Sequence, residues 1–263
     1  MKRQLRIIPR LDIKNNTIVK GIHLEGLRVV GMPAAASQKY YAQGADEILY
    51  MDAVASLYER NSLKDIISEV CQNVFVPLTV GGGIRSIEDI REILRAGADK
   101  VAINTAAIKR PALVREAALT FGSQCIVGSI EAKRMGEGRW EAYIDTARES
   151  TGKDAIEWAH ELVALGAGEL LVTSIDHEGT RRGFEIDLIK RIADSVSVPV
   201  IACGGCGSVQ DIEKLLGATE VSAVACASVF HYDVLTIGQV KDGLAQKGFA
   251  VSQRSAKYET GHH

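Results

Sequence analysis

Two glycine-rich segments of similar sequence are the parts of this chain best suited to bind an anion. VPLTVGGGIRSIEDI begins at Val76 and VPVIACGGCGSVQDI begins at Val198. In both, glycines follow an apolar run and a serine then opens a helical pattern, so backbone N–H groups at the helix start can bind a phosphate. We therefore predict two phosphate sites, one containing Gly83 and the other Gly204 and Gly205. The alternative is that the glycines only form tight turns.

Small or polar residues follow the next apolar run in each half of the chain. They are Asn104 and Thr105 in the first half, and Ala227 and Ser228 in the second. Their side chains and backbone N–H groups could complete the two sites. A small substrate with a phosphate at each end could then span them.

Carboxylates end several of the apolar runs, at Asp12, Asp52, Glu131 and Asp176. Asp12 and Glu131 are separated by 119 positions (131 − 12), close to the 122 (199 − 77) that separate the two glycine-rich segments. Equivalent positions in two halves would face each other across one site, as a general acid (Asp12) and a complementary base (Glu131). The alternative is that each carboxylate only caps the loop that follows it.

Eight short apolar runs alternate with amphipathic segments and must position these residues. The segments IEDIREILRAG and DAIEWAHELVALG each end in glycine, a helix stop signal. The pattern predicts a (β/α)8 TIM barrel made of two similar half-barrels, with a doubly wound open sheet as the alternative. We expect one domain over residues 1–252 and a disordered tail over 253–263, part of which an expression tag could supply. The expected strands are residues 6–13, 47–54, 76–83, 100–106, 124–132, 169–176, 198–205 and 222–228.

Composition argues against several classes of protein. The net charge of −2 gives no basic surface for nucleic acid, and no apolar run is long enough to cross a membrane. The chain has no signal-peptide pattern at its start, so we expect a cytoplasmic protein. Cys203 and Cys206 form a CxxC, but no second pair or histidine cluster accompanies it, so flanking a glycine turn is favoured over redox or metal chemistry. We expect no metal and no cofactor.

Four charged residues stand at the starts of the expected strands, where they would gather at the opposite mouth of the barrel. Taken alone, they predict a stabilising ion network. They are Arg6, Glu47, Lys100 and Glu169.

The motifs together resemble the cyclase subunit of imidazole glycerol phosphate synthase, from about Arg6 to about Phe249. The resemblance rests on RIIPRLDIKNNTIVKG, YMDAVAS, TVGGGI, GADKVAINTAA, FGSQ, GAGELLVTSID, ACGGCG and ASVFH. It implies a histidine-pathway enzyme that uses ammonia to convert phosphoribulosyl-formimino-aminoimidazole carboxamide ribotide, a bisphosphate, to imidazole glycerol phosphate and aminoimidazole carboxamide ribotide. It also implies a heterodimer with a glutaminase subunit, docked at the amino-terminal mouth of the barrel.

The resemblance assigns further roles by position. Asp12 and Glu131 match the two catalytic carboxylates, and Asp176 and Gly179 match substrate-binding residues. Lys20 matches a substrate-binding lysine of a mobile first loop. The four charged residues at the strand starts match a gate through which ammonia enters the barrel.

Four residues depart from the pattern of this family. Glu131 replaces an aspartate, Arg10 a cysteine, Val54 a threonine and Glu178 an aspartate. An added methylene moves a carboxylate by about 1.5 Å, enough to cost about 10²-fold in rate. An alternative is therefore a paralogue that uses ammonia to form an acetamidino group on a surface-polysaccharide sugar. A second alternative is a non-catalytic scaffold that activates a glutaminase. The related one-chain isomerase of the same pathway ranks third among the enzymes, because it would not need the gate charges.

Overall fold

Eight parallel strands close into a barrel in the computed structural model, which describes residues 4–53 and 63–253. They pair in the order β10-β11-β12-β1-β4-β5-β6-β7, and β10 also pairs with β7, which closes the ring. This confirms the barrel and excludes the open sheet. The barrel strands are β1 (Arg6–Lys14), β4 (Ile48–Asp52), β5 (Leu78–Gly81), β6 (Lys100–Ile103), β7 (Ile126–Gly136), β10 (Glu169–Ser174), β11 (Val200–Cys203) and β12 (Ala223–Cys226).

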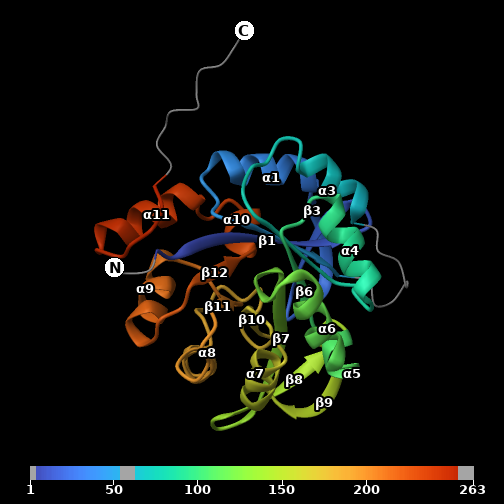
Figure 1. Cartoon of the computed structure of the whole chain (residues 1–263). Coiled ribbons are helices and arrows are strands. Elements are labelled where there is room, and N and C mark those ends of the chain that lie inside the picture. The colour runs from blue at the N-terminus through green and yellow to red at the C-terminus, as the bar shows by residue number, and fades with distance from the viewer. Residues whose placement is uncertain (1–3, 54–62, 254–263) are drawn as a thin grey trace.

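Helices surround the strands on the outside of the barrel (Figure 1). Strand residues alternate between two apolar layers, so that Ile7 packs toward the helices and Ile8 packs inside the barrel. The helices are α1 (Pro33–Ala42), α3 (Lys64–Val70), α4 (Ile87–Ala96), α5 (Thr105–Lys109), α6 (Ala112–Phe121), α7 (Ala155–Ala164), α8 (Ile186–Ala193), α9 (Val209–Ala218), α10 (Ser228–His231) and α11 (Ile237–Gln246), with a 3-10 turn η1 (Ser123–Cys125).

The helices that follow the two glycine-rich segments begin in the same way. Ser86 caps α4 by accepting from the Asp89 N–H, and Ser208 caps α9 by accepting from the Asp211 N–H. A side-chain cap of this kind fixes where the helix starts. The duplicated sequence therefore produces a duplicated local structure, as two half-barrels require.

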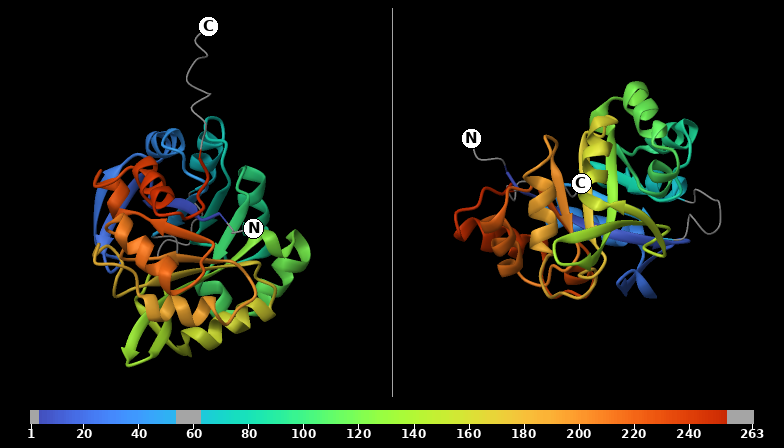
Figure 2. Two further views of the ribbon diagram at one scale, coloured as in Figure 1. Left: turned by 90° about the vertical axis from the view of Figure 1, so that its left-hand side faces the viewer. Right: turned by 90° about the horizontal axis from the view of Figure 1, so that it is seen from below.

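Two antiparallel hairpin extensions were not predicted from the sequence. The strands β2 (Thr17–Ile22) and β3 (Glu25–Gly31) extend from β1, and β8 (Arg139–Ile144) and β9 (Glu149–Asp154) extend from β7. Figure 2 shows the turn between β7 and β8, in lime green, reaching beyond the surrounding helices. Each extension continues the first strand of a half-barrel, so each begins beside one of the two predicted catalytic carboxylates.

The described part of the chain contains no helix with the length and apolar character that a membrane crossing would need. The predicted tail over residues 253–263 lies outside the described residues, apart from Gln253.

Candidate active site

The first predicted phosphate site lines a cavity of about 400 Å³ at the carboxyl ends of β5 and β6. Gly83, Asn104 and Thr105 all border this cavity. The Asn104 amide nitrogen donates to the Tyr143 carbonyl over 3.2 Å, while its buried Oδ1 accepts from no partner in the described chain. Gly82 adopts φ +90°, and a Cβ there would lie 2.5 Å from the Asp52 carbonyl oxygen. The site is therefore open, with an unsatisfied polar atom in its wall.

The second predicted phosphate site is much narrower. Gly179, Gly204, Gly205, Ala227 and Ser228 surround a space of only about 10 Å³. The loop over residues 177–183 covers it, with the Gly183 N–H donating to the Gly205 carbonyl over 2.8 Å. In this conformation the space holds about one water molecule.

Asp12 lies between two buried cations at the centre of the carboxyl-end mouth. Arg10 donates from Nε to the Asp12 carboxylate over 2.9 Å, and Lys20 Nζ lies 3.6 Å from the other oxygen. Lys20 also forms an ion pair with Glu178, which ties the β2–β3 hairpin to the loop after β10. Burial by itself would raise the pKa of Asp12, but the charges of Arg10 and Lys20 outweigh burial and hold that pKa below its ordinary value.

Glu131 lies four strands away from Asp12 in either direction around the ring and has a different environment. It borders both the first predicted phosphate site and a smaller cavity of about 30 Å³ that Asp12 and Lys20 also line. Its carboxylate accepts from the Ala147 N–H over 2.9 Å and forms no ion pair within the described chain. Burial raises the pKa of Glu131 to about 7, only partly offset by the charge of Arg10 and by the Ala147 N–H.

The remaining predicted substrate residues lie around this centre. The Asp176 carboxylate accepts from the Arg134 N–H over 2.8 Å. Gly179 lies so close to β2 that a Cβ would come within 2.5 Å of the Gly21 carbonyl oxygen. Lys20 contacts the carboxylates and lines neither phosphate site, so in this state its position differs from that of a phosphate ligand.

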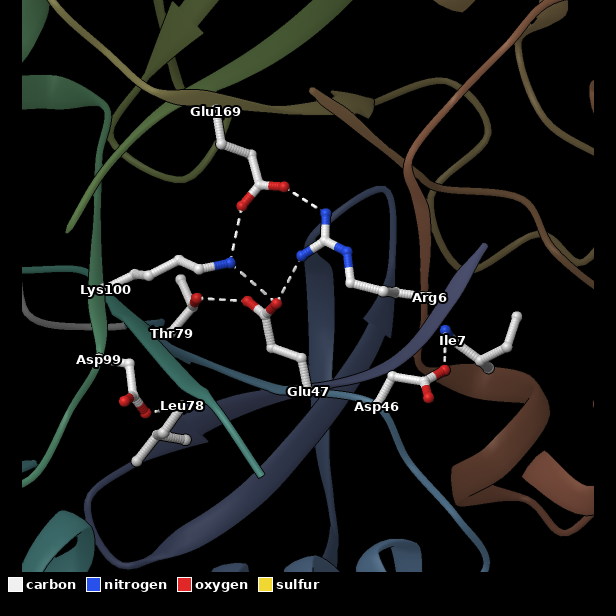
Figure 3. A network of polar contacts seen from close by, with 9 residues as sticks. All are labelled: Arg6, Ile7, Asp46, Glu47, Leu78, Thr79, Asp99, Lys100 and Glu169. Atoms are coloured by element: carbon white, nitrogen blue, oxygen red, sulfur yellow. Dashed lines mark hydrogen bonds and ion pairs between the residues drawn. The ribbon is translucent and has the colours of Figure 1, made fainter. Parts of the chain in front are cut away.

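The four charged residues at the strand starts form a closed ring at the amino-end mouth (Figure 3). Lys100 lies 2.9 Å from Glu47 and 2.8 Å from Glu169, and Arg6 forms ion pairs with the same two carboxylates. Glu47 also accepts from the Thr79 hydroxyl. Each cation therefore bridges both carboxylates. Between this ring and the active-site mouth lie buried apolar side chains, which are Ile8, Leu49, Met51, Ala102, Val127, Leu171, Ile201, Cys203, Ala223 and Ala225.

Two site residues were noted in the sequence only as departures from the family pattern. Arg10 and Glu178 are both buried. Arg10 contacts Asp12, and Glu178 contacts Lys20. Alternation along β1 could have found Arg10, since residues 6, 8, 10 and 12 share one face. Val54, a third departure, lies outside the described residues.

The two cysteines of the CxxC are not joined by a disulfide bond. Cys203 and Cys206 are both buried and free. No group of three or more His, Cys, Asp or Glu side chains within residues 4–53 and 63–253 is arranged to hold a metal ion.

Comparison with known proteins places this chain in one family. The sequence model of the histidine biosynthesis protein family matches residues 6–236. A protein of Legionella pneumophila named imidazole glycerol phosphate synthase subunit HisF is 58% identical over 207 residues. That alignment covers 79% of this chain and 98% of the relative.

Proposed function

Because this chain belongs to the histidine biosynthesis protein family, we propose that it is the cyclase subunit of an imidazole glycerol phosphate synthase. The observation that carries the proposal is the 58% identity to a protein of that name over 98% of its length. The reaction joins ammonia to the bisphosphate substrate and yields imidazole glycerol phosphate and aminoimidazole carboxamide ribotide, in the cytoplasm and without a metal or cofactor.

The proposed substrate fits the duplicated halves of the barrel. One phosphate would bind at Gly83, Asn104 and Thr105, where backbone N–H groups start α5. The other would bind at Gly204, Gly205 and Ser228 after the covering loop opens. Asp12 and Glu131 would then lie beside the middle of the substrate, where bonds form and break.

The proposed ammonia source is a glutaminase subunit docked at the amino-end mouth. Two observations support this location. The charged ring closes this mouth, and two hollows of about 380 Å³ lie on the same side of the barrel, beside the starts of β5 and β11. Phe75, at the edge of one hollow, is 73% exposed. Exposed apolar surface around a polar centre is typical of a protein interface.

The barrel interior is suited to carry ammonia from this mouth to the carboxylates. Neutral ammonia can move among apolar side chains, whereas ammonium would pay the cost of leaving water. Movement of Arg6 or Lys100 would open the ring toward this apolar interior.

A direct assay tests the function. The purified chain, supplied with ammonium salt and the ribulosyl substrate, should form both products without a partner, and Asp12→Asn should abolish this while leaving the fold intact. No turnover at high ammonia with a folded protein would refute the cyclase. The sugar-modifying paralogue and the glutaminase-activating scaffold gain no support from the comparisons.

A further inference from the structure

Five of the ionisable side chains at the centre of the mouth do not balance in charge if all five are ionised. Arg10 and Lys20 supply two positive charges, whereas Asp12, Glu131 and Glu178 can supply three negative ones. None of the five is more than 6% exposed. An uncompensated buried charge is expensive, so a buried cluster of this kind favours one neutral carboxyl group.

The contacts select which carboxyl group is neutral. Asp12 is in contact with Arg10 and Lys20, and Glu178 forms an ion pair with Lys20. Glu131 has only the Ala147 N–H, which a carboxyl group can also satisfy through its carbonyl oxygen. It is the one member of the three that no cation contacts.

Arg10 is held in place independently of Asp12. Its Nη1 donates to the Thr173 hydroxyl over 3.1 Å and to the Cys203 sulfur over 3.5 Å, from the two strands β10 and β11. The guanidinium is therefore fixed by two bonds that do not involve Asp12, and it points its Nε–H at Asp12. A fixed donor of this kind orients a carboxylate and keeps it ionised.

We propose that Arg10 is a positioning residue that holds Asp12 as the permanently ionised member of the pair and leaves Glu131 as the member that carries the transferable proton. This reverses the roles expected from the sequence, in which Asp12 is the acid. Its meaning for catalysis rests on the proposed cyclase function. The Glu131 O–H bond breaks as the proton passes to the leaving atom of the substrate, and the carboxylate then takes up the proton that the attacking ammonia loses. Asp12 stays charged and stabilises the positive charge that develops on nitrogen.

The other groups around the pair are consistent with this division. His231 faces Asp12 and donates from Nε2 to the Arg10 carbonyl over 3.0 Å, and burial lowers its pKa to about 4, so it is neutral at physiological pH. Asp52 and Thr146 border the same small cavity, and the Cys203 thiol faces Arg10. None of these adds a positive charge beside Glu131. Arg85, Lys109 and Arg110 line the larger cavity that Glu131 also borders, and there Lys109 forms an ion pair with Glu149 and Arg110 with Glu116.

Infrared spectroscopy of isotopically labelled protein tests the assignment without turnover. With labelled glutamate, one carboxyl group should titrate near pH 7, and Glu131→Gln should remove it. With labelled aspartate, Asp12, identified by its loss in Asp12→Asn, should stay ionised from about pH 5 to about pH 9. Arg10→Gln should raise the pKa of Asp12 by at least about one unit, and Arg10→Lys should bring that pKa part of the way back. The exposed Arg139→Gln is the matched control and should change neither.

The possible outcomes separate the two proposals. If Arg10→Gln does not fold, Thr173→Val removes one hydrogen-bond partner of Arg10 and keeps the charge of Arg10. This variant should also raise the pKa of Asp12, by less than Arg10→Gln would. A protonated Asp12 at neutral pH in the unmodified protein, or a Glu131 ionised below about pH 6, would overturn the inference even if the enzyme turns over. The expected titrations without any turnover would instead refute the cyclase.

Discussion

Replacing Glu131 by glutamine should stabilise the folded protein by an amount that grows with pH. The pKa of this carboxyl is about 7 in the folded state, raised by burial from an ordinary value of 4.5. Between these values the folded state holds a proton that the unfolded state has released, so stability falls as pH rises. The difference of about 2.5 pH units, at 1.36 kcal/mol per unit, corresponds to about 3 kcal/mol. Glutamine resembles the neutral form and avoids this loss.

Urea unfolding of the two proteins at a series of pH values measures the effect. The variant and the original should be nearly equal in stability at about pH 4, and the variant should be about 3 kcal/mol more stable at about pH 8. Titration of His231, which has the opposite sign, occurs in both proteins and cancels in the difference. Glu137→Gln, at an exposed position of the β7–β8 extension, should change stability by less than about 0.5 kcal/mol at every pH. A stability difference that does not vary with pH would show that Glu131 is not a neutral buried carboxyl.

Three further substitutions test the other parts of the site. Lys20→Met removes a cation that two buried carboxylates share, so it should lower the free energy of unfolding in urea by about 3 kcal/mol and speed proteolysis within β2 and β3. The control Lys14→Met, at an exposed position, should do neither. Lys100→Met opens the amino-end ring, so less product should form in the complex per glutamine hydrolysed. Turnover with added ammonia should stay within about twofold of the original. Equal losses of activity in both assays would contradict a gate. Gly205→Ala places a Cβ 1.9 Å from the Gly183 carbonyl oxygen at φ +101°, so substrate affinity should fall at least about tenfold. The control Gly217→Ala has open space around its Cβ, and it should raise the free energy of unfolding by about 0.5–1 kcal/mol.

The barrel could be predicted because its strands and helices carry strong local patterns. The expected strand over residues 100–106 contains β6, and the helical pattern IEDIREILRAG covers α4 to within one residue. Glycine and serine spacing also indicated where the two helix starts would lie. These features depend on burial and capping within about a dozen neighbouring residues, which a sequence displays directly.

The hairpin extensions and the ion pairs could not be predicted in the same way. Strand β3 is mostly exposed or half-buried, so it shows little apolar alternation, and only its pairing with β2 makes it a strand. The ion pair between Lys20 and Glu178 joins residues 158 positions apart. A contact of this kind depends on how two loops pack over the barrel, which no local pattern encodes.

The same packing explains why the departures from the family pattern belong together. Arg10 adds a buried positive charge beside Asp12, and Glu178 supplies a buried negative charge through Lys20. Returning Arg10 alone to a neutral residue would leave Lys20 to balance both Asp12 and Glu178, at the cost of an unpaired buried carboxylate. Glu131 belongs to the same electrostatic cluster. Burial raises the pKa of Glu131 most, the charge of Arg10 lowers that pKa, and the charges of Asp12 and Glu178 raise it further. The substitutions are therefore coupled through one electrostatic cluster, and residues that contact in this way are expected to be non-additive when changed.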